Sequence, residues 1–307
     1  MPGAFIFGAV RVINTRKAVR MLLELAIGDA YGAAFEYADT EYIRRYNDAT
    51  RYVSHPRREI ERGHYTDDTQ MSIAIAEAIA AGDEWTPLAL ANRFVEVFHR
   101  DPRAGYAGGF YFFLYKTETG GAFLRQIRPD SDKSGAAMRA APIGVFPTIA
   151  EVIEKSTIQA KLTHNTPNGI AAAVAASLMT HYFLYRHGPK AGLGEFLEEY
   201  VPGHPWAQPF RHKVGSAGWM SVRAAVTAVV DHHCLTDILR AAVANTGDVD
   251  TVATIALAAA SCSTEVEQNL PVSLVEGLEN GTYGRDYLRS LDQQLLARIQ
   301  FNPEGGR

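Results

Sequence analysis

The chain has 307 residues, of which 47% are hydrophobic and 21% are charged, a balance typical of a globular protein with a large core. The net charge of −4 gives no reason to expect nucleic acid as a partner. Only two cysteines occur, so no disulfide framework is implied and a reducing compartment is expected. The apolar run Ala4–Val10 lacks a preceding basic residue and a cleavage site, and nothing is long enough to span a membrane. We therefore expect a cytoplasmic protein.

Apolar residues at helical spacing dominate the chain. They predict a first helix over Arg16–Ala34, in which Gly28 and Gly32 indicate close packing or the approach of another backbone. Glu36–Gly63 is polar and weakly patterned, which indicates a long surface connection, and connections of that length are often functional. Further helices are predicted over Thr69–Ala81, Pro87–His99, Ala136–Gly144, Thr148–Ala160, Gly169–Tyr185, Gly218–Val230, Leu235–Ala244, Thr251–Cys262, Pro271–Glu279 and Asp286–Ile299.

Alternating strand patterns are nearly absent, so the sequence predicts an all-α fold. The Gly- and Pro-rich segment Gly188–Pro209 is a candidate domain boundary. We favour one compact multi-helix domain over residues 1–307, because acidic stretches on the two sides of this segment would complete a single site. Residues 1–15 and 302–307 are expected to fray. We expect a monomer.

Two acidic stretches stand at the starts of predicted helices. The first is Tyr65-Thr66-Asp67-Asp68-Thr69-Gln70 and the second is Thr246-Gly247-Asp248-Val249-Asp250-Thr251. A Thr or Asp before a helix is usually an N-cap, and Asp67 with Gln70 fits a capping box. Capping requires only one short polar side chain, however, and each stretch carries a second carboxylate that adds repulsion.

The surplus carboxylates favour a metal site. Asp and Thr oxygens are hard ligands, which suit Mg²⁺ or Mn²⁺ better than zinc. Asp67, Asp68, Asp248 and Asp250 together would balance the charge of two divalent cations, and such a pair can bind two substrate oxygens and activate a water. If the fold brings the two stretches together, the sequence predicts a centre with two Mg²⁺ or Mn²⁺ ions.

Five segments, taken in chain order, resemble the ADP-ribosylglycohydrolase family. They are Leu25-Ala26-Ile27-Gly28-Asp29-Ala30-Tyr31-Gly32 with Glu36 after it, Thr66-Asp67-Asp68-Thr69, Gly135-Ala136-Ala137-Met138-Arg139, Leu162-Thr163-His164 and Gly247-Asp248-Val249-Asp250-Thr251. No single short motif is decisive, but five in the right order are a strong signal, and the match extends over most of the chain. Many family members have Gly-Asn-Gly where this chain has Lys133-Ser134-Gly135, so the Asn amide that contacts the substrate in the family is absent here, and Lys133 could replace it by attraction to a phosphate.

The resemblance implies an all-α domain with a binuclear Mg²⁺ or Mn²⁺ centre in a cleft, and ADP-ribose and an ADP-ribosylated protein as partners. The implied metal ligands are Thr66, Asp67, Asp68, Asp248, Asp250 and Thr251. The metals would fix the vicinal hydroxyls of the ribose, and an activated water would attack C1″ through an oxocarbenium-like transition state. The implied catalytic residues are Asp67, Asp68, Asp248 and Glu36, the last at the position of a mobile acidic residue with a gating or acid–base role.

The other predicted contacts concern the diphosphate. Ser131, Lys133, Ser134 and Gly135 could supply backbone N–H donors and positive charge, although Lys133 is explained equally well as a solvated lysine. Gly105, Gly108 and Gly109 resemble a family glycine loop that lets a diphosphate approach, or form an ordinary turn.

Four further features of the sequence each allow two interpretations. His164 is interpreted as a ligand contact rather than a packed or capping histidine. Asp29 is expected behind the metal ligands rather than as a turn-former, and Arg139 is expected to pair with a buried acid rather than to touch substrate. His232-His233-Cys234 has no second ligand cluster that would complete a zinc site, so it indicates a helix C-terminus.

Three functions are compatible with the sequence. The leading hypothesis is metal-dependent hydrolysis of the glycosidic bond between ADP-ribose and a modified side chain. The second is a hydrolase of another ribosyl or nucleotide conjugate, suggested by the Lys133-Ser134 departure and by the unfamiliar Glu36–Gly63 segment. The third is a non-catalytic ADP-ribose binder or crystallin-like structural protein, which would have no need of four clustered carboxylates.

Overall fold

Fifteen α-helices and two short 3₁₀ helices make up the structure, a computed structural model that describes residues 21–299. The α-helices are α1 (Met21–Gly32), α2 (Thr40–Tyr46), α3 (Asp67–Ala81), α4 (Pro87–Arg100), α5 (Gly108–Lys116), α6 (Gly120–Gln126), α7 (Gly135–Met138), α8 (Ile149–Lys161), α9 (Pro167–Leu184), α10 (Leu193–Tyr200), α11 (Gly218–Asp231), α12 (Leu235–Ala244), α13 (Val249–Ser261), α14 (Val272–Gly277) and α15 (Arg285–Ala297). The 3₁₀ helices are η1 (Ala141–Val145) and η2 (Lys190–Gly192).

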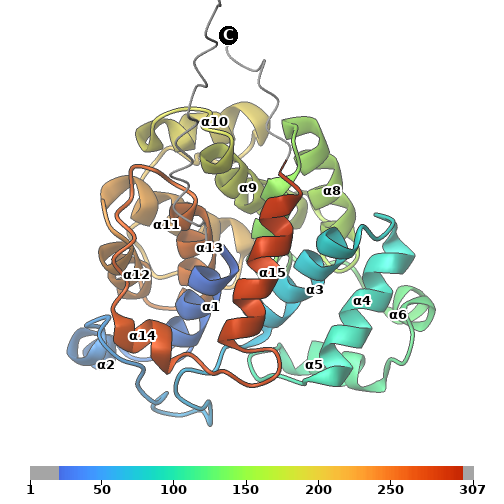
Figure 1. The fold of residues 1–307 in the computed structure, drawn as a ribbon, viewed down its shortest axis with the longest axis horizontal. Coiled ribbons are helices and arrows are strands. Elements are labelled where there is room, and N and C mark those ends of the chain that lie inside the picture. Colours follow the sequence, from blue (N-terminus) through green and yellow to red (C-terminus); the bar gives the residue numbers. More distant parts are fainter. Residues whose placement is uncertain (1–20, 300–307) are drawn as a thin grey trace, which may run out of the picture.

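Helices α1 and α13 form the centre of the fold, and every residue of both is buried (Figure 1). Two glycines of α1 allow this close packing. A Cβ at Gly28 would stand 2.6 Å from the carbonyl oxygen of Ala253, and one at Gly32 would stand 2.4 Å from the Cα of Asp250. The prediction of close packing at both glycines is confirmed, and it brings α1 against the turn that carries the second acidic stretch.

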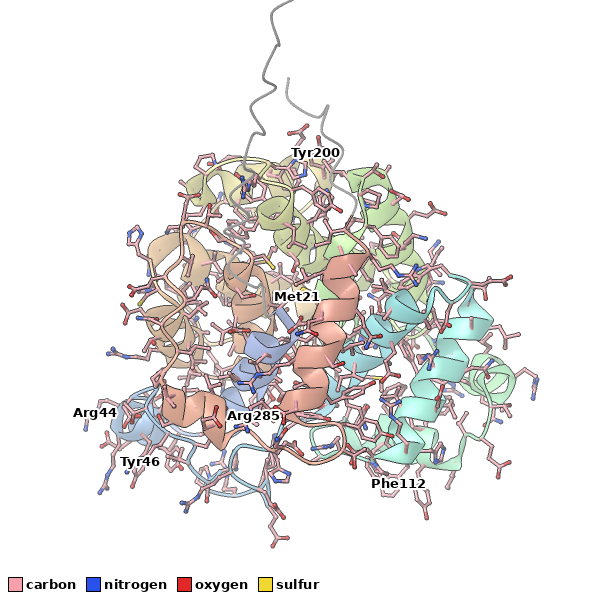
Figure 2. The ribbon with its side chains drawn as sticks, in the orientation of Figure 1. Met21, Arg44, Tyr46, Phe112, Tyr200 and Arg285 are labelled. Carbon is pink, nitrogen blue, oxygen red and sulfur yellow. The ribbon has the colours of Figure 1, made fainter. Side chains whose placement is uncertain are left out.

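The other helices surround this pair. Helices α9, α11 and α12 pack against α13, whereas α3 and α15 pack against α1, with α4 outside α3 (Figure 1). Helices α5 and α6 form one flank beside α4, and α2 lies near α12 on the opposite flank. Figure 2 accordingly places Phe112 of α5 and Arg44 of α2 at opposite edges of the molecule.

The buried apolar side chains of residues 21–299 form one cluster that draws on helices from both sides of the Gly188–Pro209 segment. Four isolated β-bridges are the only extended pairings in this range. The predicted all-α class and the single multi-helix domain are therefore confirmed. No helix between residues 21 and 299 has both the length and the apolar character needed to cross a bilayer.

The predicted helices are found within a few residues of their expected ends, with three differences. Ala136–Gly144 is not one helix, because Pro142 lacks the N–H that would continue it, and the chain instead forms α7 followed by η1. Glu36–Gly63 is not a plain surface connection, since Asp39 caps α2 within it and accepts a hydrogen bond from Tyr42 N. The Gly188–Pro209 break contains η2 and α10.

Helices α5 and α6 were not predicted. Helix α5 begins with two glycines and continues with aromatic residues, which have low helix propensity, so its sequence gave little helical signal. The start of the predicted Arg16–Ala34 helix, the apolar run Ala4–Val10 and the expected frayed ends at 1–15 and 302–307 lie outside the described residues.

Candidate metal centre and substrate cleft

A cleft of about 860 Å³ opens where the N-termini of α3 and α13 meet. Its walls come from these two turns, from the segment after α1, from α5 and the loop before it, and from the loop between α6 and α7. All the residues predicted as ligands or contacts line it except Thr66, which is buried beside it. The lining members are Glu36, Asp67, Asp68, Gly105, Gly108, Gly109, Ser131, Lys133, Ser134, Gly135, His164, Asp248, Asp250 and Thr251.

The first acidic turn is held in place by Asp29 of α1. Its carboxylate accepts hydrogen bonds from Thr66 N at 2.9 Å, Thr66 Oγ1 at 2.7 Å, Thr69 N at 3.0 Å and Thr69 Oγ1 at 2.6 Å. Asp29 thus caps α3 from another helix and stands behind the proposed metal ligands, as predicted. Because the cap is supplied by α1, the adjacent carboxylates of Asp67 and Asp68 are left to face the cleft.

The predicted capping box between Asp67 and Gln70 is wrong. Thr66 is the N-cap residue and makes no side-chain capping bond. The Gln70 amide instead donates to the carbonyl oxygens of Val97 and Asp101 and accepts a hydrogen bond from the Tyr106 hydroxyl. Three long-range partners have replaced the local one, so Gln70 fastens the 101–106 loop to α3.

Gly105 explains why that loop comes so close to the carboxylates. Its φ is +102°, and a Cβ there would stand 2.1 Å from Asp67 Oδ1. Asp67 N also donates to the carbonyl oxygen of Ala104. A glycine is therefore required at 105 by both conformation and contact, whereas a Cβ at Gly108 or Gly109 would meet nothing within 4 Å.

The second acidic turn is held by its backbone. Thr246 and Gly247 have φ values of +62° and +93°. Val214 bonds to the residues on both sides of Gly247, since Val214 N donates to Thr246 O and Asp248 N donates to Val214 O. This turn directs Asp248 towards the cleft, where Ser221 Oγ donates to Asp248 Oδ2 at 3.1 Å.

Five buried aspartates crowd this end of the cleft, namely Asp29, Asp67, Asp68, Asp248 and Asp250. Burial raises the pKa of each, and the charge of neighbouring carboxylates raises the pKa values of Asp67, Asp68 and Asp250 further. Within residues 21–299, none of the five has an ion pair with a lysine, arginine or histidine. The carboxylates therefore lack a counter-charge from the described part of the chain.

Glu36 approaches the second turn from the segment after α1. One oxygen each of Glu36, Asp248 and Asp250 lie within 4.8 Å of one another, an arrangement that could hold a cation. Glu36 also forms an ion pair with Arg58. The next residue, Tyr37, has a φ of +50° and donates its N–H to Gly247 O at 2.8 Å. The backbone therefore ties the Glu36 segment to the acidic turn.

The residues present fit a hard divalent cation. The donors are carboxylate and hydroxyl oxygens, with no sulfur or imidazole among them, which matches the preference of Mg²⁺ or Mn²⁺. In the described structure Asp68 Oδ1 is buried and has no hydrogen-bond partner. Leaving a carboxylate oxygen in that state is costly, and a cation would satisfy it.

Another wall of the cleft is cationic and aromatic. Arg128, Lys133 and Arg139 line it, together with Phe110 and Phe113 of α5, whose rings stack at 5.9 Å between centroids. The prediction that Arg139 pairs with a buried acid is wrong. The guanidinium is buried but bonds to uncharged acceptors on Gln159, Gly135 and Thr163, and no acid pairs with it in residues 21–299.

Several cleft residues escaped the sequence reasoning. Arg58 had no local signal, since it lies in the weakly patterned 36–63 segment and reaches Glu36 only through the fold. Thr163 was noted beside His164 but was given no role. The aromatic residues of α5 were a visible cluster that could have suggested a stacking surface. The His232-His233-Cys234 stretch follows the last residue of α11, as predicted.

Known proteins resemble this chain in sequence and fold. It is 28% identical over 190 residues to the ADP-ribosylhydrolase ARH3 of Xenopus tropicalis, which covers 58% of this chain and 53% of that protein. It is 27% identical over 186 residues to the ADP-ribosyl-[dinitrogen reductase] glycohydrolase of Rhodospirillum rubrum, covering 57% and 60%. The chain thus spans about half the length of the curated relatives it matches.

A solved structure described as an ADP-ribosylglycohydrolase-related protein complex superimposes with a TM-score of 0.72 at 20% identity, over 92% of this chain and 98% of that one. At that identity the likeness concerns the fold alone. The family model named ADP-ribosylglycohydrolase matches residues 12–304, which is nearly the whole sequence. The chain therefore belongs to the ADP-ribosylglycohydrolase family.

Proposed function

We propose that this protein hydrolyses the glycosidic bond between ADP-ribose and a modified protein side chain, with Mg²⁺ or Mn²⁺ at the two acidic turns. One observation carries the proposal. Carboxylates from three separate segments converge in a cleft of about 860 Å³ that is also lined by Arg128, Lys133 and Arg139. That size is within the range of cavities that bury a whole ligand. A molecule with a diol at one end and a diphosphate in the middle suits such a division of charge.

The ligands proposed for two ions are the side chains of Thr66, Asp67, Asp68, Asp248, Asp250 and Thr251. Divalent cations bound there would fix the two vicinal hydroxyls of the ribose and make a nearby water more acidic. The aspartates would also stabilise the positive charge that develops on the sugar as its bond to the side chain breaks.

Glu36 is the proposed proton acceptor. Its carboxylate stands beside Asp248 and Asp250, and the ion pair with Arg58 holds it there. As the water oxygen bonds to C1″, Glu36 would take the proton that the water loses. The leaving side-chain atom would keep the electron pair of the broken bond and take up a proton from solvent. Tyr37 supports this position through its backbone bond to Gly247.

The test of the function is a panel of linkages. The protein is incubated with Mg²⁺ or Mn²⁺ and with peptides ADP-ribosylated on arginine, serine or threonine, and free ADP-ribose is measured. Release from at least one peptide is expected, together with loss of release in Asp248→Asn but not in Asp237→Asn, a change on the exposed face of α12. If metal binds but no peptide is cleaved, a different nucleotide conjugate is the substrate. Tight ADP-ribose binding with every conjugate intact would indicate a binder.

The metal assignment has a separate readout. Metal content and thermal stabilisation by Mg²⁺ or Mn²⁺ are compared in the wild type, Asp248→Asn and Asp237→Asn. Equal stabilisation in all three would remove Asp248 from the ligands. Glu36→Gln distinguishes a proton acceptor from a ligand, because we expect it to keep the stabilisation by metal and to lose turnover.

A further inference from the structure

Arg139 is a buried cation whose hydrogen bonds all go to uncharged groups. Its side chain is 1% exposed and lies over the Phe94 ring, 4.7 Å from the centroid. Nε donates to Gln159 Oε1 at 2.8 Å, and Nη1 donates to Gly135 O at 2.9 Å. Nη2 donates to Thr163 Oγ1 at 2.8 Å. The guanidinium has only donors, so the direction of each of these bonds is fixed.

The bond from Arg139 determines what the Thr163 hydroxyl can do. A hydroxyl has a single proton, and Thr163 Oγ1 already accepts from Arg139. Its second partner is His164 Nδ1, at 2.7 Å. Within residues 21–299 these two are the hydrogen bonds that the Thr163 hydroxyl makes. Both the proton and the lone pairs of the hydroxyl find a protein partner only when the proton is donated to His164 Nδ1, and this is the direction we infer.

This direction leaves the remaining imidazole proton on His164 Nε2. The ring is 7% exposed, and burial together with the charges of Arg139 and Lys133 lowers its pKa to about 3, so it is neutral at physiological pH. The Cε1–Nε2 edge faces Gly135, where a Cβ would stand only 3.0 Å from Cε1. In the described structure Nε2 has no protein acceptor, although His164 lines the cleft. An N–H donor is thus available to a ligand.

We propose that Arg139 and Thr163 are positioning residues that hold His164 in its Nε2–H tautomer, so that it donates a neutral hydrogen bond to a phosphate oxygen of the ligand. The ligand part of this inference rests on the proposed function, since it takes the diphosphate of ADP-ribose as the acceptor. The tautomer itself rests only on the hydrogen bonds.

The arrangement has a physical advantage over a charged histidine. A neutral donor avoids placing a second buried cation next to Arg139, while the charge of Arg139 polarises the hydroxyl and the ring that stand between it and the cleft. The wrong tautomer would present a lone pair to the phosphate, and two acceptors repel each other. The Thr163 hydroxyl therefore determines whether His164 attracts or repels a phosphate oxygen.

The first experiment observes the tautomer directly. Nitrogen NMR of the ¹⁵N-histidine-labelled protein distinguishes a protonated ring nitrogen from a bare one, and the His164 signals are assigned by their absence in His164→Gln. We expect protonated Nε2 and bare Nδ1 in the ligand-free wild type. A protonated Nδ1 would overturn the positioning role, whatever the ligand is.

The second experiment uses a matched pair of variants. Thr163→Val keeps the shape of the side chain and removes the hydroxyl, while Arg139 Nη2 keeps its bond to Gln159 O. Thr163→Ser keeps the hydroxyl. In the presence of Mg²⁺, we expect the affinity for ADP-ribose, measured by calorimetry, to fall roughly tenfold in Thr163→Val and to stay at the wild-type level in Thr163→Ser. The stabilisation by Mg²⁺ alone should be the same in all three proteins.

The outcomes separate the two proposals. Wild-type affinity and an unchanged His164 spectrum in Thr163→Val would refute the role of the hydroxyl. If the wild type shows the Nε2–H tautomer but does not bind ADP-ribose, then the proposed ligand fails and the positioning of His164 stands.

Discussion

The acidic end and the cationic wall of the cleft both bury ionisable side chains, and they differ in how the cost of burying charge is met. At the acidic end, Asp67, Asp68 and Asp250 are buried near one another, and desolvation and repulsion raise their pKa values. On the cationic wall desolvation also acts, but it lowers the pKa of His164 to about 3 and that of Arg139 to about 9. Burial disfavours the charged form in every case.

The two regions differ in the partners that their buried polar groups have. The wall needs no counter-ion, because His164 is neutral and Arg139 bonds to carbonyl, amide and hydroxyl oxygens of the chain itself. The acidic end has no ion-pair partner for its aspartates in residues 21–299 and leaves Asp68 Oδ1 without a hydrogen bond. We therefore expect the stability of the acidic end to depend on an added cation, and the stability of the wall to depend on pH and on its own residues but not on metal.

Substitutions at the acidic end should destabilise the protein most when they affect the backbone of the second turn. Gly247 has a φ of +93°, and a Cβ there would stand 1.9 Å from the carbonyl oxygen of Val214. Gly247→Ala should lower the free energy of unfolding by about 3 kcal/mol or more, because strain and clash add, and should abolish stabilisation by Mg²⁺. Chemical denaturation measures both effects.

Gly281→Ala is the matched control, since a Cβ at that position meets nothing within 4 Å. The two alanine variants should differ by most of the predicted loss. Similar stabilities would show that the second turn can move away from Val214 without cost.

A substitution that weakens the first turn should cost less stability, and the cost should depend on whether metal is present. Asn at position 29 has one acceptor oxygen for the four hydrogen bonds that Asp29 receives from Thr66 and Thr69. We expect Asp29→Asn to cost about 2 kcal/mol of unfolding free energy with Mg²⁺ present. The cost should be smaller without metal, because the lost charge also relieves repulsion on Asp67 and Asp68.

Asp292→Asn provides the comparison. Asp292 accepts hydrogen bonds from Leu22 N and Leu23 N at the start of α1, away from the cleft. Its replacement should destabilise the protein equally with and without Mg²⁺. A metal-independent loss in Asp29→Asn as well would contradict the electrostatic contribution assigned to Asp29.

The acidic end was largely predictable from sequence, because its signals are local. Paired carboxylates before two apolar helical runs indicated the turns, and Gly28 and Gly32 indicated the close packing that brings α1 against the second turn. The sequence did not reveal that Asp29 caps α3. That role depends on two segments separated by 37 residues or more meeting in space.

The wall was predicted less well for the same reason. Arg139 was expected to find an acid, but its partners were set by the approach of Gln159 and Thr163 from α8 and the residues after it. Propensity also failed at α5, where tertiary packing of Phe110 and Phe113 overrides a weak helical signal. Local patterns therefore locate the residues of this cleft, whereas the pairing among them depends on the fold.

His164 allows the wall to be tested by pH. Its pKa falls from 6.5 to about 3 on folding, so below pH 6.5 the unfolded chain binds a proton that the native state does not. Stability should therefore fall as the pH falls towards 3, and at pH 5 the penalty is about 2 kcal/mol. His164→Gln should remove that part of the acid sensitivity, as seen by denaturation at pH 7.5 and pH 5. His233→Gln, at an exposed site, should leave it unchanged.

The smallest effect is expected at Lys133, the residue that departs from the family pattern. Its side chain is exposed at the edge of the cleft, so water and salt screen its charge. Lys133→Met should weaken ADP-ribose binding by roughly threefold at low ionic strength and by less in 0.5 M salt, a pattern expected of screened attraction to a diphosphate. Lys116→Met, on the exposed side of α5, should leave binding unchanged at both salt concentrations. If Lys133→Met matches that control, position 133 is a solvated lysine, and the neutral donor of His164 and the buried charge of Arg139 must suffice to hold the diphosphate.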